Sequence, residues 1–404
     1  MFYRKSAAKI KAVAAKNRLV TLFLVLGVVI AAALLTYFIR VQTGGIRVTH
    51  RFDNGDVYSG YWRYGVPYGA GFLATASGRL YDGVWDKDGR LTHGLMVTKD
   101  YSYSGAFDDY MPQGFGECRY NDGNVYYGHF AAGRSQGLGR MEYADGTIDF
   151  GHWDKGRIHY PEGQNYHTGN LVYGMDVSNH QKRIKWDSLT LYADANGIVT
   201  GKLRSSPYLQ PVLFVLIKSS EGTDFTAHTF ERNFAEAKRC GIVRGAYHFL
   251  RLSDIDGQIR NFIDNTPLQP GDLPPVLDME LDNSVMAREK DKAIAYAHKW
   301  LEAMERHYGV RPMLYTYDSY YNNYLKGEGF EDYDFFIARY SEDNMPRVPH
   351  LEIWQFSEKG NLQGINAPTD LDIFMGDYAD FKKYVSENCI RRPSPGSNGG
   401  RPGR

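Results

Sequence analysis

The chain has 404 residues, enough for two or three domains, and its 47 Lys and Arg residues balance its 47 Asp and Glu residues. A chain without net charge lacks the excess positive charge that attracts nucleic acids, so we expect no nucleic-acid partner. The three cysteines, Cys118, Cys240 and Cys389, are too few and too scattered for a disulfide framework or a zinc cluster. We therefore expect isolated thiols without a function.

The N-terminal region predicts a membrane anchor. Residues 19–39, LVTLFLVLGVVIAAALLTYFI, carry no charge and are numerous enough to cross a bilayer as one helix. Residues 1–18 contain several Lys and Arg residues and no acidic one, which places them in the cytoplasm by the positive-inside rule. A cleaved signal peptide is the alternative, but the apolar run is longer than usual and ends in bulky Tyr37 and Phe38. We expect a single-pass membrane protein whose remaining domains lie outside the cytoplasm, in the periplasm or at the cell surface.

A repeat follows the apolar segment. The motifs YSGYW, YDGVW, YSGAF, YYGHF and DFGHW recur every 22 or 23 residues, with their glycines at Gly60, Gly83, Gly105, Gly128 and Gly151. Between them lie alternating apolar and polar segments with Asn-Asp-Gly and Ala-Asp-Gly turn signals. This period predicts one β-hairpin per unit, with aromatic side chains stacking on the next unit in an elongated sheet.

These units resemble MORN repeats, whose pattern is close to Tyr-x-Gly-x-Trp followed by Gly-x-Gly. The resemblance covers residues 51–157 and implies an all-β hairpin array that could contact a protein or lipid partner. A passive spacer is the other interpretation. The sequence favours the spacer, because no basic or apolar cluster marks a binding face.

Residues 171–388 alternate strands with helices. Eight apolar runs predict strands: LVYGMDVS, PVLFVLIKSS, VRGAYHFLR, PPVLDMEL, RPMLYTY, YDFFIARY, LEIWQF and TDLDIF. Between some of them, helical stripes end at Gly241 and Gly309. The pattern predicts an α/β fold with a TIM-like (β/α) barrel, made irregular because the last strands leave little room for helices. Residues 389–404, rich in Pro, Gly and Arg, predict a disordered tail.

Four carboxylates fall on three of these predicted strands. Asp278 and Glu280 are two positions apart in LPPVLDMELDN, so both face the same side of the strand. Asp176 lies late in YGMDVS and Asp370 lies in TDLDIF. Because chemistry in such barrels sits at the C-terminal ends of the strands, we expect the four acids to meet at one mouth. Aromatic residues that end other strands suit a cleft that stacks on sugar rings, namely Tyr247, Tyr315, Tyr340 and Trp354.

Six of these segments, from YGMDVSNHQKRIKW to IWQFSEKGNLQGINAPTDLDIF, resemble in order the strand motifs of glycoside hydrolase family 25, the N-acetylmuramidase lysozymes. The resemblance implies a peptidoglycan substrate cut at the β-1,4 bond after N-acetylmuramic acid, with no metal or organic cofactor. It makes Glu280 the general acid and Asp278 its modulator and a holder of the substrate N-acetyl group, with Asp176 and Asp370 completing the acidic floor. Within the same motifs, Lys218 and Gln355 are expected to bind substrate.

The resemblance implies retention of configuration with substrate assistance, but whether an Asp attacks directly stays open in the sequence. The chain departs from the family at three places, where Lys182 replaces a usual Gly, His228 an expected Asp and Thr369 a common Val. A glycan-binding scaffold without catalysis, whose repeats recruit protein or lipid partners, is the alternative function. A metal site is not indicated, because the 12 histidines show no ligand spacing, and His248 suits packing or substrate contact.

Overall fold

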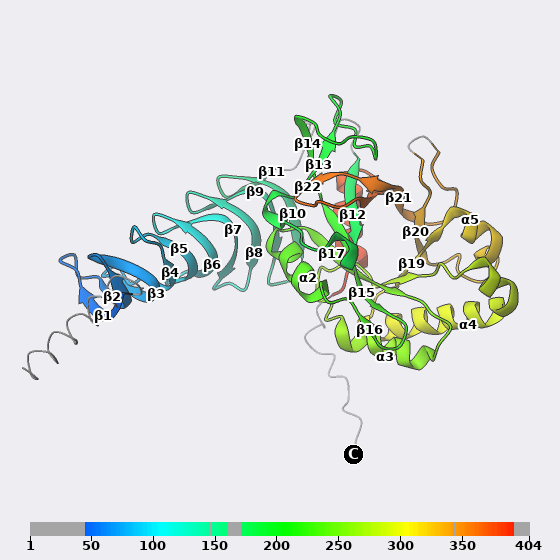
Figure 1. Ribbon diagram of the computed structural model, residues 1–404, viewed down its shortest axis with the longest axis horizontal. Coiled ribbons are helices and arrows are strands. Elements are labelled where there is room, and N and C mark those ends of the chain that lie inside the picture. The colour runs from blue at the N-terminus through cyan, green and yellow to red at the C-terminus, as the bar shows by residue number, and fades with distance from the viewer. Residues whose placement is uncertain (1–44, 146, 160–170, 342–343, 392–404) are drawn as a thin grey trace, which may run out of the picture. The chain divides into compact units, whose positions relative to one another are not determined.

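The computed structural model describes residues 45–145, 147–159, 171–341 and 344–391 (Figure 1). They fall into two compact units that divide between Met111 and Pro112. The predicted membrane segment 19–39 and its basic leader 1–18 lie outside the described residues, as does nearly all of the predicted tail. Among the helices that the structure does describe, none is long and apolar enough to cross a membrane. The three cysteines are all buried and unpaired.

The first unit is a series of antiparallel strands in which each strand pairs with the next along the chain. Two strands make one repeat, as predicted, but the array begins five residues before the predicted start at residue 51. Its strands are β1 (Ile46–Arg51), β2 (Val57–Arg63), β3 (Val66–Ala74), β4 (Leu80–Trp85), β5 (Leu91–Val97) and β6 (Tyr101–Asp108).

The repeated Tyr and Gly residues form one close-packed element. The Tyr58 ring is fully buried, and its hydroxyl donates to the Tyr61 carbonyl oxygen at 2.8 Å. A Cβ atom on Gly60 or Gly71 would come within 2.5 Å of the Tyr58 hydroxyl oxygen, so the ring occupies the space that the glycines leave. Tyr103 and Tyr126 repeat the arrangement with Ala106 and His129 as acceptors. A tyrosine seated on a glycine pair thus recurs with the repeat, at Tyr58 and Tyr126, whereas the Tyr81 hydroxyl donates to the Tyr110 carbonyl oxygen at 3.4 Å.

One face of the first unit corrects the expectation that no apolar cluster marks the array. Strand register places alternate residues of β2 to β5 on a common face, which is the one turned away from the buried tyrosines. Six large apolar side chains on it are between 37% and 50% exposed: Tyr61, Phe72, Leu80, Val84, Leu95 and Val97. The cluster escaped sequence analysis because its members lie on different strands and come together only through register.

The second unit starts with five more strands of the same kind, again paired in chain order. They are β7 (Met111–Tyr120), β8 (Val125–Ala131), β9 (Arg134–Glu142), β10 (Ile148–Asp154) and β11 (Arg157–His159). The remainder of this unit is a barrel.

All eight predicted barrel strands are present, and they close into a ring because β12 pairs with both β15 and β23. Seven run parallel, whereas the last runs antiparallel to both of its neighbours. The ring consists of β12 (Val172–Val177), β15 (Phe214–Glu221), β17 (Val243–Phe249), β18 (Val276–Asp278), β19 (Met313–Tyr317), β20 (Asp334–Ala338), β21 (Leu351–Gly360) and β23 (Thr369–Phe374).

The reversal of β23 corrects one step of the sequence argument. Asp370 is the second residue of its strand, so it lies at the beginning of the strand and not at the C-terminal end. It still reaches the mouth of the barrel, because an antiparallel strand starts at the edge where its parallel neighbours end. Asp370 therefore pairs in register with Asp176, near the C-terminal end of β12.

Helices cover the barrel irregularly, as predicted. The helix before Gly309 begins earlier than its apolar stripe suggested and has a non-helical residue at Glu289, while three helices, α3, α5 and α6, were not predicted. The helices are α2 (Phe230–Arg239), α3 (Ile255–Asn265), α4 (Asn283–Tyr308), α5 (Asp318–Tyr320) and α6 (Tyr378–Asn388), with short turns η1 (Asn179–Gln181), η2 (Trp186–Ser188) and η3 (Tyr321–Leu325). A small sheet of β13 (Thr190–Ala193), β14 (Tyr208–Pro211) and β22 (Leu362–Gln363), and a hairpin strand β16 (Phe225–Thr226), complete the unit.

The last hairpins pack directly on the barrel within the second unit, where α2 contacts β8 and α6 contacts β10. Arg140 of β9 is fully buried, and its Nη2 atom donates to Glu142 Oε1 at 2.6 Å and to the Pro270 carbonyl oxygen at 3.0 Å. Lys238 of α2 lies 3.3 Å from Glu142 Oε1. A Cβ atom on Gly241 would come within 2.8 Å of the Gly139 Cα atom, so the backbones nearly touch. We call this contact region the junction.

Candidate active site

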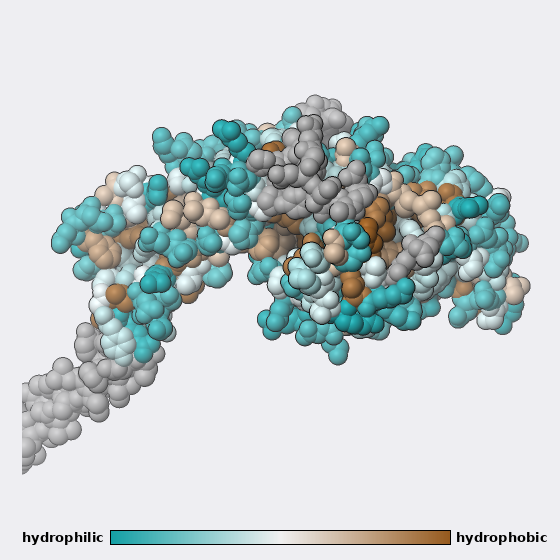
Figure 2. Space-filling model, turned by 90° about the horizontal axis from the view of Figure 1, so that it is seen from above, coloured by the Kyte–Doolittle hydropathy of each residue, from teal (hydrophilic) through white to brown (hydrophobic). Residues whose placement is uncertain are grey.

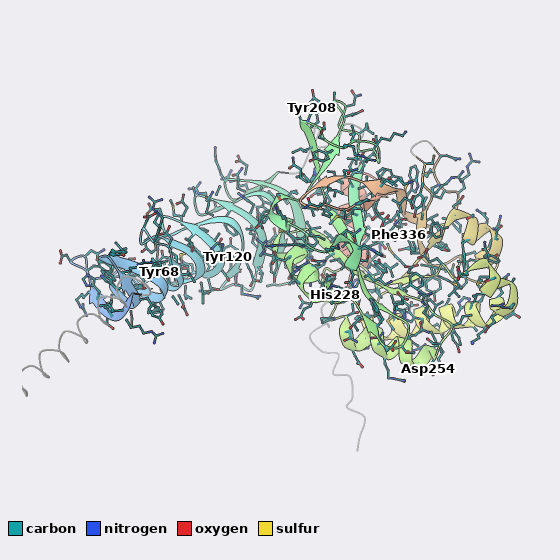
Figure 3. All side chains as sticks on the ribbon, in the orientation of Figure 1. Tyr68, Tyr120, Tyr208, His228, Asp254 and Phe336 are labelled. Atoms are coloured by element: carbon teal, nitrogen blue, oxygen red, sulfur yellow. The ribbon has the colours of Figure 1, made fainter. Side chains whose placement is uncertain are left out.

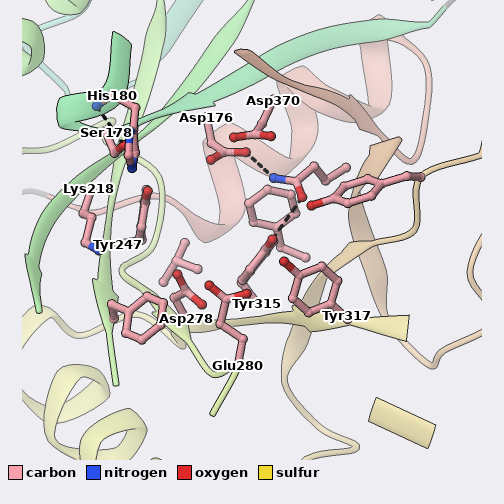
Figure 4. Close-up of a pocket in the computed structure, with 15 residues that line it drawn as sticks. Asp176, Ser178, His180, Lys218, Tyr247, Asp278, Glu280, Tyr315, Tyr317 and Asp370 are labelled. Atoms are coloured by element: carbon pink, nitrogen blue, oxygen red, sulfur yellow. Dashed lines mark hydrogen bonds between the residues drawn. The ribbon is translucent and has the colours of Figure 1, made fainter. Parts of the chain in front are cut away.

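A cleft of about 280 Å³ opens at the C-terminal ends of the parallel barrel strands (Figure 4). It brings together the four predicted acids and five of the six predicted substrate-binding residues. The residues that line it are Asp176, Ser178, His180, Lys218, Tyr247, Phe249, Val276, Asp278, Glu280, Tyr315, Tyr317, Phe336, Tyr340, Gln355 and Asp370. The sequence did not single out Ser178, His180, Phe249, Val276, Tyr317 or Phe336.

Asp278 and Glu280 stand at the end of β18, and both reach the cleft. Asp278 is 5% exposed, and its Oδ1 atom has no hydrogen-bond partner among the described residues. Burial and the neighbouring Glu280 carboxylate raise the pKa of Asp278 well above its usual range. Burial also raises the pKa of Glu280, although a hydrogen bond with Tyr317 opposes the increase. The pair can therefore hold a proton at a pH where ordinary carboxyl groups have lost theirs.

Asp176 and Asp370 face this pair from neighbouring strands. They are register partners across β12 and β23, and Figure 4 shows their carboxyl groups next to each other. Gln355 Nε2 donates to Asp176 Oδ2 at 2.5 Å, and Tyr315 donates its hydroxyl to Gln355 Oε1 at 3.0 Å. Burial, followed by the charge of Asp370, raises the pKa of Asp176 well above its usual range, while burial raises the pKa of Asp370 to about 6.

A fifth carboxyl group, Asp372, lies below the cleft and was missed. It is two residues after Asp370, so it points to the same side of β23, into the barrel. Its side chain is fully buried, and neither oxygen has a hydrogen-bond partner among the described residues. Burial, with the charges of Asp176 and Asp370, raises its pKa well above the usual range. The sequence signal for it was the strand alternation of TDLDIF, in which both acids share one face.

Three of the four predicted aromatic residues line the cleft, namely Tyr247, Tyr315 and Tyr340. Trp354 does not, and its prediction was wrong. On β21 it precedes Gln355, which points into the barrel, so strand alternation turns the indole outward into the apolar layer around the barrel. There Trp354 Nε1 donates to the Arg339 carbonyl oxygen at 2.9 Å.

A basic rim borders one side of the cleft. Lys218 Nζ lies 2.6 Å from Glu221 Oε2 and 4.7 Å from the centre of the Phe249 ring. Arg251 also pairs with Glu221 and stacks on Phe249. Lys218 thus brings a positive charge to the acidic cleft, and this charge opposes part of the increase that burial causes in the pKa of Asp278 and of Glu280.

His248 packs in the core and does not contact the cleft. It is fully buried, its Nδ1 atom lies 2.8 Å from Ser220 Oγ, and its ring stacks on Trp300. Burial lowers its pKa to about 4, which keeps the ring neutral at physiological pH. Among the described residues, no group of three or more His, Cys, Asp and Glu side chains is arranged to hold a metal ion.

The three departures from the family pattern lie outside the group of four carboxyl groups in the cleft. Lys182 has a φ of 53°, a backbone conformation that favours glycine and explains why Gly is usual there. His228 is exposed just before α2 (Figure 3), and Thr369 is buried, with its hydroxyl donating to the Ala367 carbonyl oxygen at 3.1 Å. None of the three lines the cleft.

A closed barrel whose mouth holds paired carboxyl groups of raised pKa, with tyrosines around them, has the equipment of a glycoside hydrolase. Residues 175–365 match the model of the family described as Glycosyl hydrolases family 25. The chain is 31% identical over 218 residues to the protein YegX of Escherichia coli K12, covering 53% of this chain and 73% of that one. The chain belongs to glycosyl hydrolase family 25 and is a glycoside hydrolase.

Other relatives carry descriptive names. Lysozyme M1 of Streptomyces globisporus is 28% identical over 223 residues, covering 52% of this chain and 69% of that one. Among solved structures, a family GH25 lysozyme from Aspergillus fumigatus is 26% identical with a TM-score of 0.43, covering 54% of this chain and 99% of that one.

Proposed function

We propose that the protein is a peptidoglycan hydrolase, an N-acetylmuramidase that cuts the β-1,4 bond between N-acetylmuramic acid and N-acetylglucosamine. The observation that carries the proposal is the arrangement of Asp278 and Glu280 in one cleft opposite Asp176 and Asp370. Relatives named lysozyme and N,O-diacetylmuramidase support the choice of substrate. The three tyrosines that line the cleft supply flat faces for sugar rings.

Glu280 is the general acid in this proposal. Its pKa is raised by burial, so a proton is available to the glycosidic oxygen as the bond breaks and positive charge develops at the sugar carbon. Tyr317 lines the cleft beside this carboxyl group and opposes the increase of its pKa by burial. After the leaving sugar departs, the Glu280 carboxylate accepts a proton from the attacking water.

Asp278 orients the N-acetyl group of the substrate, whose oxygen attacks the sugar carbon from the opposite side and is later displaced by water. Two successive displacements give retention of configuration. Asp278 suits this role because its Oδ1 atom is buried and has no partner among the described residues. Direct attack by an aspartate is the competing route, and a trapped glycosyl-enzyme ester would identify it.

The rest of the chain sets where the hydrolase works. In our proposal residues 19–39 form a membrane anchor, residues 1–18 stay in the cytoplasm, and the barrel acts in the periplasm or at the cell surface. The hairpin repeats are of the MORN type, and they hold the barrel away from the membrane while leaving a face open for a partner.

Digestion of purified peptidoglycan by the full chain in mild detergent tests the function. Mass analysis of the new reducing ends should find muramic acid, and wild type should release soluble fragments that the Glu280→Gln variant does not. Glucosamine at the new ends would overturn the bond assignment. Binding without any cleavage would favour the non-catalytic glycan-binding scaffold.

A further inference from the structure

The first unit carries a hollow of about 470 Å³ on the open face of its hairpins. Four side chains cross this face as one row, because Thr49, Ser59, Phe72 and Asp82 are successive register partners on β1 to β4. Arg47 stands beside the row with its guanidinium 5.3 Å from the centre of the Tyr61 ring. Phe72 is 40% exposed. We call this site the Phe72 hollow.

The polar groups of the Phe72 hollow are available to a ligand. Within the part of the chain that the structure describes, neither Arg47 nor Asp82 takes part in an ion pair or a side-chain hydrogen bond. Thr49 and Ser59 contact only each other through their hydroxyls, at 3.4 Å. An exposed ring is therefore flanked by one unpaired cation, one unpaired anion and two hydroxyl groups.

The equivalent row of side chains in the second unit is buried against the barrel at the junction. Tyr127 and Arg140 are register partners on β8 and β9, so they hold the places of Ser59 and Phe72, and Arg140 directly follows the second glycine of its repeat, as Phe72 does. Both are buried at the junction, where Lys238 of α2 lies 4.6 Å from the centre of the Tyr127 ring. The same row of the repeat is thus a contact surface in the second unit, and within the described residues of the first unit its Phe72 side chain is exposed.

We propose that the Phe72 hollow binds a segment of the wall glycan that the barrel cleaves, an inference that rests on the proposed function. An exposed aromatic ring with hydrogen-bonding groups around it offers a sugar both an apolar face and polar partners. Arg47 and Asp82 cancel in charge, which fits a polymer of hydroxyl and acetamido groups. A membrane surface or a nucleic acid would require a basic cluster, and the hollow has a single basic residue.

The repeat spacing supports this choice of ligand. Two strands rise roughly 10 Å across the sheet, which is similar to the length of two β-1,4-linked sugar rings. A glycan laid across the strands would therefore meet one disaccharide per hairpin. Leu95 is the register partner of Asp82, so it continues the row with an exposed apolar group. Figure 2 shows apolar residues interspersed with hydrophilic ones on one side of the array.

Co-sedimentation with insoluble peptidoglycan tests the proposal. The full chain, carrying Glu280→Gln to stop cleavage, is compared with versions that also carry Phe72→Ala, Phe72→Leu or Phe72→Tyr. Losing the ring should weaken binding roughly threefold to tenfold, the range of an aromatic contact. Tyrosine should preserve binding, whereas leucine should not, because it is apolar without a flat face. Val84→Ala is the matched control, since Val84 is on the same face, 50% exposed and outside the hollow.

Two results would overturn the proposal: unchanged binding of Phe72→Ala, or an equal loss in Val84→Ala, which would indicate a general apolar docking face for a protein. Cleavage assays with otherwise unmodified protein separate this inference from the function. Peptidoglycan that is bound through Phe72 but never cut would refute the hydrolase function and support glycan binding by the Phe72 hollow. Peptidoglycan that is cut at the normal rate but bound equally well without the Phe72 ring would support the hydrolase and refute glycan binding by the hollow.

Discussion

The junction and the barrel mouth both bury charged groups, but with opposite partners. At the junction, Glu142 lies between Arg140 and Lys238, and nearby Arg244 forms a buried two-point pair with Asp272, at 2.8 and 3.1 Å. At the mouth, four carboxyl groups converge, and Asp372 lies beneath them without a hydrogen-bond partner among the described residues. Oppositely charged neighbours keep their charge when buried, whereas neighbouring carboxyl groups must retain protons.

The difference separates groups that hold the fold from groups that, in the proposed function, serve the reaction. A pair such as Arg140 and Glu142 leaves a buried, unbalanced charge when either partner is removed. A crowded carboxyl group costs the folded state free energy, and its replacement by an amide should relieve this cost. Such crowding is characteristic of active sites, where a raised pKa makes a general acid possible.

The largest effect is expected at the mouth. Glu280→Gln keeps the shape of the side chain but cannot donate a proton, so cleavage should fall by about 10²–10⁴-fold with the folded state at least as stable as wild type. Rates on soluble glycan strands and thermal unfolding would be measured together. Glu302→Gln, at an exposed position of α4, is the control. Retention of more than roughly a tenth of the rate would exclude Glu280 as the acid.

Replacing a charged residue at the junction should lower the stability of the fold. Arg140→Met leaves Glu142 with a single cationic partner, Lys238, and should lower the free energy of unfolding by about 3–5 kcal/mol. Cleavage of short glycans by the folded fraction should stay at the wild-type rate. Denaturant unfolding measures the loss, and Arg306→Met, which removes an exposed pair with Glu302, should cost less than about 1 kcal/mol. Similar losses of unfolding free energy in Arg140→Met and Arg306→Met would contradict the difference between the buried and the exposed ion pair.

Replacing Asp372 should change the free energy of unfolding by a smaller amount, which depends on pH. Its folded-state pKa is above the ordinary value, so the folded protein binds a proton that the unfolded chain releases, and stability falls as pH rises between the two. Asp372→Asn should match wild type near pH 4 and become more stable by about 1–3 kcal/mol near neutral pH. Unfolding free energies measured across this pH range test it. A parallel pH dependence in both proteins would show that Asp372 is not the titrating group.

The smallest expected change is in the pH profile of catalysis. Activity should be bell-shaped, falling on the alkaline side as Glu280 ionises and on the acidic side as its neighbours, including Asp370 with a pKa of about 6, become protonated. Asp278 and Glu280 share one site and the Glu280 charge raises the pKa of Asp278, so Asp278→Asn should change the position of the alkaline limb of the residual activity. A limb that stays in place would mean that the two carboxyl groups titrate independently.

Much of the fold could be read from the sequence. Tyr-Gly periodicity predicts the hairpins because a buried ring needs a glycine pair, and eight apolar runs predict the barrel strands. The direction of β23 could not be read, since antiparallel and parallel strands share the same alternation. Helix α3 was missed because its sequence, IDGQIRNFIDN, contains a glycine and few strong helix formers, and packing stabilises it instead.

The candidate site was predicted where residues share a strand face and missed where contact depends on neighbouring strands. Asp278 and Glu280 follow from a spacing of two. Trp354 was misplaced because the sequence does not fix which face of β21 enters the barrel. Tyr317 was missed, although it is two positions after the predicted Tyr315 and so faces the same way.

The junction also has a consequence for synthesis. Asp149 of β10 is held by Lys382 of α6 at 2.7 Å, across 233 residues of chain. A ribosome working at 5–20 residues per second would need roughly 10 to 50 seconds to make that interval. During this delay the first hairpins can already stack, while the last ones keep their barrel-facing side uncovered. The period when the nascent chain most needs protection from aggregation therefore begins after the array has emerged and ends only when α6 arrives.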